Sequence, residues 1–206
     1  MKKSELENAI KLQNELAKKV ITKNFLPRKI KKVCGVDVSY SSNTAFCSAV
    51  ILNKDDFDVI KTANLSMRNS SPYIPSLFML KESKPILKTL ECLDEDFDVL
   101  LVDSHGQLHP RQCGLACYVG LMTNKPVIGI AKSLLCGLVK DSHVKINGKI
   151  LGYEIKRHEK KIYVSVGHKI SLKTAVKIAT ELIKEDHWYP EPLRLANLYS
   201  KKIRAG

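Results

Sequence analysis

The sequence contains no long uninterrupted run of apolar residues, which argues against a membrane-spanning protein. A helix that crosses a bilayer needs about 20 consecutive apolar residues, and no stretch of the 206 residues approaches that length. The first 20 residues also lack the pattern of a signal or transit peptide. Their apolar side chains recur on a roughly helical period between charged ones, at Ile10, Leu12, Leu16 and Val20. The sequence therefore predicts an intracellular, cytoplasmic protein without a membrane partner.

Paired cysteines with the spacing of a zinc site are also missing. The chain has six cysteines, most of them in apolar stretches such as VCGVDV and AFCSAV, and none form a C-x2-C pair. Cys113 and Cys117 lie four residues apart, where a buried pair of small apolar side chains is the common arrangement. Disulfides rarely persist in a reducing compartment, so we expect free thiols.

Acidic residues are scarce relative to basic ones. The chain carries 34 Lys and Arg against 21 Asp and Glu, which gives a formal net charge of +13. Such an excess favours a polyanionic partner, because contacts with phosphates release condensed counterions. Nucleic acid is the leading candidate, although a solvated basic surface would give the same count. Charge alone says nothing about chemistry.

Hydrophobic periodicity predicts strands and helices in a single domain over residues 1–206, because no repeat, low-complexity segment or linker divides the chain. Helices are expected over residues 4–23, 77–93, 113–123, 172–187 and, as a short terminal helix, 191–203. Strands are expected over residues 32–40, 44–53, 57–67, 97–104, 125–133, 144–146, 149–157 and 160–167. This order predicts an α/β fold with a mixed central sheet flanked by helices, which is the outline of a ribonuclease H-like core.

Two aspartates lie in predicted apolar strands, where a charged side chain has no structural role. Asp37 lies within the apolar segment VCGVDVSY, and Asp103 ends the apolar segment VLLVDS. Burying an unpaired carboxylate is costly, and two neighbouring carboxylates repel each other unless a cation or a proton lies between them. Mg²⁺ suits such a pair because it prefers oxygen ligands and keeps waters and phosphate oxygens beside one or two carboxylates. Glu82, at the start of a predicted helix, is a candidate third carboxylate, although a favourable helix-dipole position explains it equally well.

Hydrogen-bond donors and a lysine cluster in sequence near Asp103. The following loop concentrates polar groups in Ser104, His105, Gly106, His109, Pro110 and Arg111. Lys132 follows the next apolar strand, where a lysine commonly reaches the surface but beside carboxylates could hold a phosphate or an attacking water. His168 follows a later strand, where it could contact metal, transfer a proton or only cap a turn. The residues alone favour the turn.

The segment SPYIP holds an aromatic ring between prolines in a predicted loop. Pro72 and Pro75 restrict the backbone around Tyr73 and Ile74. A ring held in this way could insert into a base stack. The ordinary alternative is a stiff connector with a buried tyrosine.

Taken in order, these segments resemble the endonuclease V family over nearly the whole chain. The resemblance rests on GVDVSY, PYIP with Glu82, VDSHGQLHPR, PVIGIAKSLL and VSVGHKISL. It implies a ribonuclease H-like fold and hydrolysis of the second phosphodiester bond on the 3′ side of a deaminated base, typically inosine, in DNA repair or in the processing of inosine-containing RNA. Metal-dependent hydrolysis of this kind is expected to leave 5′-phosphate and 3′-hydroxyl ends.

At matching positions, the resemblance implies a Mg²⁺ site formed by Asp37, Glu82 and Asp103, in which Mn²⁺ can substitute, with Lys132 and His168 as accessory catalytic residues. The segment Pro72, Tyr73, Ile74 and Pro75 becomes a strand-separating wedge. His109 and Arg111 lie along the substrate, and backbone groups of Ser104 and Gly106 read the altered base. The expected partner is nucleic acid that contains inosine or another deaminated base, bound by a monomer.

The chain departs from the family pattern at three positions. Ser104 follows the strand-end aspartate where the family usually has glycine, and Ser76 stands where glycine usually follows PYIP. Asn197 occupies a position at which relatives commonly carry aspartate, so a carboxylate role there is absent.

Two other functions are compatible with part of the pattern. A non-enzymatic RNA-binding protein explains the charge but not Asp37 and Asp103. A junction resolvase would use the same metal chemistry on branched DNA, but the PYIP segment and the spacing from VDSHG to AKS argue against it.

Overall fold

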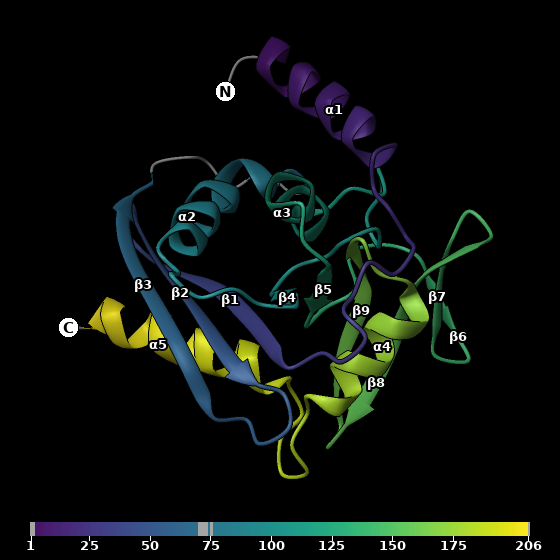
Figure 1. Cartoon of the computed structure of the whole chain (residues 1–206). Helices are drawn as coiled ribbons and strands as arrows, with labels where there is room; N and C mark the ends of the chain where they lie inside the picture. Colours follow the sequence, from purple (N-terminus) through teal and green to yellow (C-terminus); the bar gives the residue numbers. More distant parts are fainter. Residues whose placement is uncertain (1–2, 70–73, 75, 206) are drawn as a thin grey trace.

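The structure is a computed structural model that describes residues 3–69, 74 and 76–205. Helices and strands alternate along these residues (Figure 1). Their bounds are α1 Lys3–Ala17, β1 Lys32–Ser41, β2 Thr44–Asn53, β3 Val59–Arg68, α2 Met79–Glu91, β4 Val99–Val102, α3 Leu115–Thr123, β5 Val127–Ala131, β6 Leu138–Lys140, β7 His143–Ile146, β8 Lys149–Arg157, β9 Lys160–His168, α4 Leu172–Glu181 and α5 Glu191–Ala205.

The described strands form a single mixed sheet in the order β3-β2-β1-β4-β5-β9-β8-β7-β6. Strands β1, β4 and β5 run parallel to one another in the centre, and the remaining pairs are antiparallel. The prediction of a mixed sheet flanked by helices is confirmed. Its central parallel strands are the buried apolar segments of the sequence, as expected for strands that are covered on both faces.

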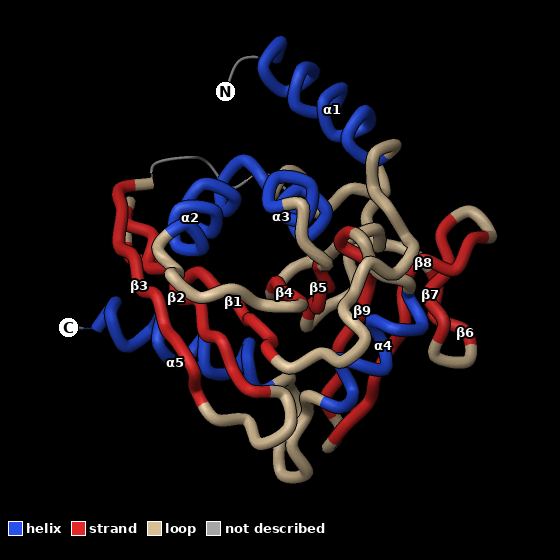
Figure 2. The backbone as a smooth tube through the Cα atoms, in the orientation of Figure 1, coloured by secondary structure: helices blue, strands red, loops and turns tan. Residues whose placement is uncertain are grey.

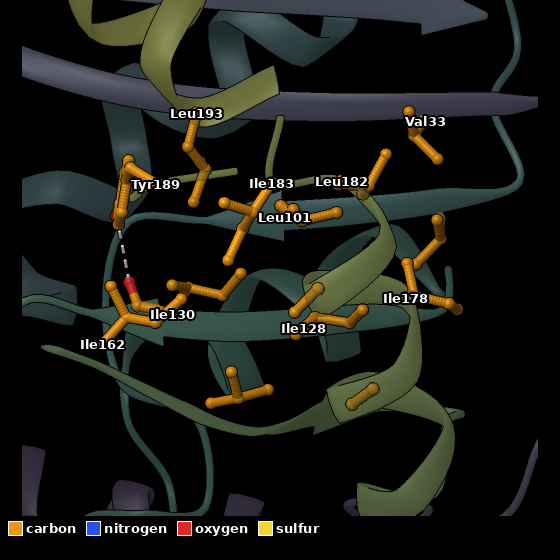
Figure 3. Packing of buried hydrophobic residues seen from close by; sticks show 14 of the residues in the cluster. Val33, Leu101, Ile128, Ile130, Ile162, Ile178, Leu182, Ile183, Tyr189 and Leu193 are labelled. Atoms are coloured by element: carbon orange, nitrogen blue, oxygen red, sulfur yellow. Dashed lines mark hydrogen bonds between the residues drawn. The ribbon is translucent and has the colours of Figure 1, made fainter. Parts of the chain in front are cut away.

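Helices cover both faces of the sheet. Helices α2 and α3 pack over one face, in a core that includes Cys34, Leu100 and Val127 (Figure 2). Helices α4 and α5 pack over the other face, where side chains of β1, β4, β5 and β9 meet Ile178, Leu182 and Leu193 (Figure 3). Helix α1 lies outside these layers and packs on α3.

Strand alternation places three polar side chains on the face that α4 and α5 cover. Successive side chains of a strand point to opposite faces, so Asp37 shares the face of Val33 in β1, and Asp103 shares the face of Leu101 in β4. The backbone N–H of Asp103 donates to the carbonyl of Val36 at 3.4 Å, which continues the β1–β4 pairing up to these residues. Lys132 follows β5 on the same face, because it continues the alternation of Ile128 and Ile130.

Helix α5 approaches β1 closely beside Asp37. A Cβ atom built on Gly35 would lie 2.4 Å from the carbonyl carbon of Pro192 in α5. Only glycine leaves room for this approach, because real Cβ contacts are not that short. The last helix is therefore held against the strand that carries Asp37.

Several predicted bounds are wrong in detail. Helix α1 ends at Ala17 rather than near residue 23, because the chain then extends towards β9, where the N–H of Phe25 donates to the carbonyl of Lys169 at 3.0 Å. Helix α4 ends at Glu181 rather than 187, and α5 is a full 15-residue helix rather than a short one. Strand β6 was not predicted, because its three residues are all exposed and show no alternation.

The length and hydropathy of the described helices test the prediction that the chain has no membrane-spanning segment. Among residues 3–69, 74 and 76–205, no helix is both long and apolar enough to span a bilayer.

Candidate active site

A cavity of about 520 Å³ opens where β1, β4 and β5 meet the starts of α2 and α3 and the side of α5. Five polar residues from these segments line it: Asp37, Glu82, Asp103, Lys132 and Asn197. The structure therefore brings together the three predicted carboxylates and the predicted lysine, together with the asparagine that stands in place of the family's aspartate.

Asp37 is more buried than Asp103, the other strand aspartate. Its side chain accepts a hydrogen bond of 2.6 Å from Nδ2 of Asn197. Burial, followed by the charge of Asp103, raises the pKa of Asp37 from its ordinary value to about 6. The hydrogen bond from Asn197 and the charge of Lys132 act in the opposite direction. Asp37 thus carries a carboxylate whose negative charge is only partly compensated by the chain.

Glu82 stands in the first turn of α2 and is buried. Its carboxylate lines the cavity, and among the described residues it makes neither a hydrogen bond nor a salt bridge. Burial raises the pKa of Glu82 well above its ordinary value, and the charges of Asp37 and Asp103 raise it further. These three groups therefore share one electrostatic environment that favours a cation or protons.

Lys132 lies against Asp103 and completes the polar cluster. Its ammonium contacts Oδ2 of Asp103, in a pair where the lysine side chain is 43% exposed and the aspartate only 14%. The same ammonium lies 4.6 Å from the centre of the Tyr189 ring, a distance at which a cation is attracted by an aromatic face. Lys132 is consequently held at the mouth of the cavity with its charge close to the carboxylates.

The donor set fits a hard divalent cation in kind. Asp37, Glu82 and Asp103 supply carboxylate oxygens only, and Mg²⁺ typically takes one or two carboxylates together with waters and phosphate oxygens. Across the described ranges, no group of three Asp, Glu, His or Cys side chains is placed to hold a metal ion. In this arrangement Lys132 contacts Asp103 and Asn197 contacts Asp37.

The loop after β4 forms one wall of the cavity and is held tightly against the sheet. The N–H of Gly106 donates to Oγ of Ser165 at 2.9 Å, and a Cβ on Gly106 would lie 2.1 Å from the carbonyl oxygen of Val166. A Cβ on Gly129 would lie 2.8 Å from the carbonyl oxygen of Ser104. Ser104 lines the cavity, whereas Gly106 lies behind it against β9.

His105, in the same loop, carries an unsatisfied polar atom. Its Nε2 is buried and has no hydrogen-bond partner among the described residues. Burial lowers the pKa of the ring, and a hydrogen bond with the backbone of Ser133 acts in the opposite direction. The sequence had shown His105 only as one of several donors, and nothing in the sequence distinguishes the orphaned nitrogen.

His109 and Arg111 hold a neighbouring segment in place. The carbonyl oxygen of Ser76 lies 2.9 Å from Nε2 of His109 and accepts a hydrogen bond of 2.8 Å from Nη2 of Arg111. Arg111 also donates to Oγ of Ser76 at 2.8 Å. Nε2 of Gln13 donates to the carbonyl oxygen of Ser76 at 3.3 Å. Burial lowers the pKa of His109 to about 4, with a further contribution from Arg111.

His109, Arg111 and Gln13 together form a clamp on Ser76. This differs from the expectation that His109 and Arg111 lie along the substrate. His109 lines the cavity, but Arg111 does not, and Nε2 of His109 and Nη2 of Arg111 both face Ser76. Ser76 itself has a φ of 62°, in the left-handed region that favours glycine. The family's usual glycine fits this conformation without strain, whereas here the serine hydroxyl gains a bond to Arg111.

Sequence reasoning missed Gln13. It is buried on α1, donates to the carbonyl of Cys113 at 2.5 Å, and accepts from Nε of Arg111. A signal was present, because Gln13 lies between Ala9 and Leu16 on the apolar side of the helix, where a polar residue needs a partner.

The predicted wedge lies outside the described residues for the most part. Pro72, Tyr73 and Pro75 are not described. Ile74 is half-buried, and its carbonyl accepts a hydrogen bond of 3.0 Å from the N–H of Leu77. The wedge stays a prediction.

His168 is not brought to the cavity. It pairs with Val127 at the start of β5, whereas Tyr163 pairs with Ala131 at the end that leads to Lys132. Its Nδ1 accepts a hydrogen bond of 3.3 Å from the N–H of Ile21, and its ring is buried. The expectation that His168 joins the carboxylates is therefore corrected, because β9 runs antiparallel to β5 and carries this residue to the opposite end of the sheet.

Comparison of the sequence with protein families identifies one match, described as Endonuclease V, over residues 14–198. Endonuclease V from Pyrococcus abyssi is 42% identical over 196 residues, which cover 95% of this chain and 91% of the relative. Endonuclease V from Thermofilum pendens is 38% identical, with 98% of this chain and 90% of the relative covered.

Solved structures with the same fold include nucleic-acid complexes. Endonuclease V of Ciona intestinalis, in complex with a 24mer DNA containing an inosine followed by a ribo-adenosine, superposes with a TM-score of 0.90 at 28% identity and covers 98% of both chains. The catalytic domain of human Endonuclease V superposes with a TM-score of 0.89 at 27% identity, covering 100% of this chain and 98% of that one.

Proposed function

Because this chain belongs to the endonuclease V family, we propose that it is an endonuclease that hydrolyses the second phosphodiester bond on the 3′ side of an inosine or another deaminated base. The observation that carries the proposal is the cavity in which Asp37, Glu82 and Asp103 lie together with Lys132. The nucleic-acid partner is supported by the net charge of +13 and by the inosine-containing DNA bound to the Ciona relative. The acting form is proposed to be a monomer, because a single copy of the chain supplies Asp37, Glu82, Asp103 and Lys132.

The proposal includes a Mg²⁺ site and a ribonuclease H-like classification. Asp37 and Asp103 would hold the ion on the shared face of β1 and β4, with Glu82 reaching it from α2. The support is the set of raised pKa values of Asp37 and Glu82, which burial raises first and mutual repulsion raises further, because a divalent cation would stabilise the ionised carboxylates against both effects. Mn²⁺, which prefers the same oxygen ligands, is expected to substitute. The order β3-β2-β1-β4-β5 with β2 antiparallel is the part of the sheet assigned to the ribonuclease H-like class.

The chain's own residues would position the phosphate and balance its charge. When bound, Mg²⁺ supplies a water of lowered pKa and positive charge at the phosphate oxygens. Lys132 adds a fixed positive charge at the mouth of the cavity, where negative charge develops on the phosphate during hydrolysis. Asn197 orients the Asp37 carboxylate through its 2.6 Å hydrogen bond. Hydrolysis by a water in this geometry is proposed to leave 5′-phosphate and 3′-hydroxyl ends.

The altered base is proposed to enter the cavity beside the loop after β4. A base must leave the stack to be tested there, and a weakened pair makes this step easier. Hypoxanthine differs from adenine in its keto oxygen and ring N–H, which need a donor and an acceptor. Ser104 and His105 line this wall, and the buried Nε2 of His105 has no partner among the described residues. The tight packing of Gly106 and Gly129 fixes the backbone that presents these groups.

The proposal is tested by mapping the cut on a labelled strand with one inosine, beside the same strand with adenosine and a four-way junction without inosine. Cleavage one nucleotide beyond inosine, dependent on Mg²⁺, is the expected result. Cutting of the junction alone would favour a resolvase, and binding without cleavage would favour an RNA-binding protein.

A further inference from the structure

A second, smaller cavity adjoins the candidate active site. It has a volume of about 260 Å³ and is lined by Lys132, Asp186, His187, Trp188, Tyr189, Arg194 and Asn197. Apart from Lys132, these residues belong to the connection between α4 and α5 and to α5 itself. Small-ligand cavities begin at about 300 Å³, so this one suits a single flat group better than a peptide segment.

The two cavities share Lys132 and Asn197. Asn197 donates to Asp37, and the Lys132 ammonium contacts Asp103. The cavities therefore meet at the carboxylates. The loop after β4 lines only the first cavity, and residues 186–189 with Arg194 line only the second, so a strand that crosses the carboxylates can reach both.

An aromatic wall stands in the second cavity. Trp188 is half-buried, and its ring lies 5.2 Å from that of Tyr189 at an interplanar angle of 41°. Tyr189 is buried and donates a hydrogen bond of 3.5 Å to the carbonyl of Ile130 (Figure 3). The indole is thus backed by a ring that is anchored in the core, which is a suitable platform for a stacked base.

Basic side chains are held around this wall by one buried carboxylate. Glu191 accepts two hydrogen bonds from Arg194, at 2.7 Å from Nε and 2.8 Å from Nη2. It also lies 3.1 Å from Nδ1 of His187 and 3.5 Å from Nζ of Lys184. Arg194 is the largest cause that lowers the pKa of Glu191. One buried negative charge therefore organises two permanent cations and a histidine, and with the exposed carboxylate of Asp186 the formal charges of these groups balance.

We infer that the second cavity binds the nucleotide just beyond the cleaved bond, with its base against Trp188 and its 5′ phosphate near Lys132. The inference rests on the proposed function. If the altered base enters beside the loop after β4 and the cleaved bond lies at the carboxylates, the strand continues in the 3′ direction towards Trp188. The occupant is then the second nucleotide on the 3′ side of inosine.

The chain contains a single tryptophan, so its fluorescence reports on this cavity alone. Two single-stranded oligonucleotides would be compared in EDTA, one with a single nucleotide and one with four nucleotides on the 3′ side of inosine. Fluorescence anisotropy of a 5′ label measures binding of each. We expect the longer strand to quench the Trp188 emission and to bind more tightly, whereas the shorter strand binds without quenching.

Cleavage by variants supplies the second readout. Trp188→Ala should raise KM by about fivefold to a hundredfold, because a base stacked on an aromatic side chain contributes affinity in this range, and Trp188→Phe should restore most of it. Phe25→Ala is the matched control, because Phe25 is 58% exposed and lies beside Lys169, close to His168 at the opposite end of the sheet.

The outcomes separate this inference from the proposed function. Equal quenching by both strands, or a Trp188→Ala variant with the wild-type KM, overturns the inference and leaves the proposed function standing. Failure of the wild-type protein to cut any inosine-containing strand in Mg²⁺ overturns the proposed function instead.

Discussion

Asn197 of the last helix donates a hydrogen bond of 2.6 Å to the carboxylate of Asp37 in the first strand. The contact joins residues 160 positions apart at the floor of the candidate active site. It depends on the close approach of α5 to β1 at Gly35. The resemblance to the endonuclease V family implies an aspartate at this position, and the neutral Asn197 gives this site one negative charge fewer than that pattern.

The substitution Asn197→Asp tests this relationship. A fourth carboxylate would replace a hydrogen bond with repulsion, and the expected loss of unfolding free energy at pH 7.5 in EDTA is about 1 to 3 kcal/mol. Mg²⁺ should reverse much of the loss, because a divalent cation offsets the added charge. Urea denaturation with and without Mg²⁺ measures both effects. Equal stability of the variant and the wild type in EDTA would contradict the assigned contact.

The pH dependence of stability follows from the raised pKa of Asp37. The folded-state pKa of about 6 lies above the ordinary value of 3.8, so the folded protein binds more protons than the unfolded chain between these pH values. Stability should then fall as pH rises through this window, by about 1 to 3 kcal/mol in the absence of metal. Glu82, with a pKa raised in the same direction, should add to this fall.

Asp37→Asn should reduce that slope in urea denaturation at a series of pH values in EDTA, because the proton bound by Asp37 is lost. Asp94→Asn is a matched control, because Asp94 is exposed and paired with Lys61 and its pKa is lowered rather than raised. A slope in Asp37→Asn equal to that of the wild type would show that burial of Asp37 is not its cause.

Gln13 should stabilise the clamp on Ser76. Gln13→Leu removes the partner of Nε of Arg111 and of the buried carbonyl of Cys113. We expect the unfolding free energy to fall by about 1 to 3 kcal/mol, because buried polar groups lose their hydrogen bonds. The neighbouring Asn14 is exposed, and Asn14→Leu should change stability by less than about 0.5 kcal/mol. Equal effects of the two substitutions would contradict the clamp.

His168 and Lys132 should behave differently on substitution. His168 is buried at the far end of β5 and bonded to the N–H of Ile21, so His168→Gln should lower stability and leave kcat close to that of the wild type. Lys132→Ala removes a charge beside Asp103 and should lower kcat by about 100-fold. A large kcat defect in a folded His168→Gln variant would restore the catalytic role that the resemblance implied for it.

Strand patterning made the position of the aspartates predictable. Asp37 and Asp103 interrupt apolar segments, and the period of two residues assigns each to one face once the strands are parallel neighbours. The position of Lys132, after the next parallel strand, could be predicted by the same alternation of side chains. These features are local in sequence, and the mixed sheet confirms the pairing on which they depend.

Strand direction and long-range hydrogen bonds were not predictable in the same way. The sequence of β9 is apolar whichever way the strand runs, and its antiparallel pairing with β5 is what separates His168 from Lys132. Gln13 and Arg111 are 98 residues apart, and the bond between them depends on the packing of α1 against α3. The ends of α1 and α4 likewise depend on the tertiary course of the connections that follow them.

The most direct test of the account is the cleavage rate of an inosine-containing strand by the wild type, Asp103→Asn and Asp94→Asn in Mg²⁺ under single-turnover conditions. We expect the wild type and Asp94→Asn to cut one nucleotide beyond inosine at similar rates and to spare the adenosine strand, whereas Asp103→Asn should be slower by about 100-fold or more. Cleavage by Asp103→Asn at the wild-type rate would contradict the assignment of the carboxylate cavity as the active site.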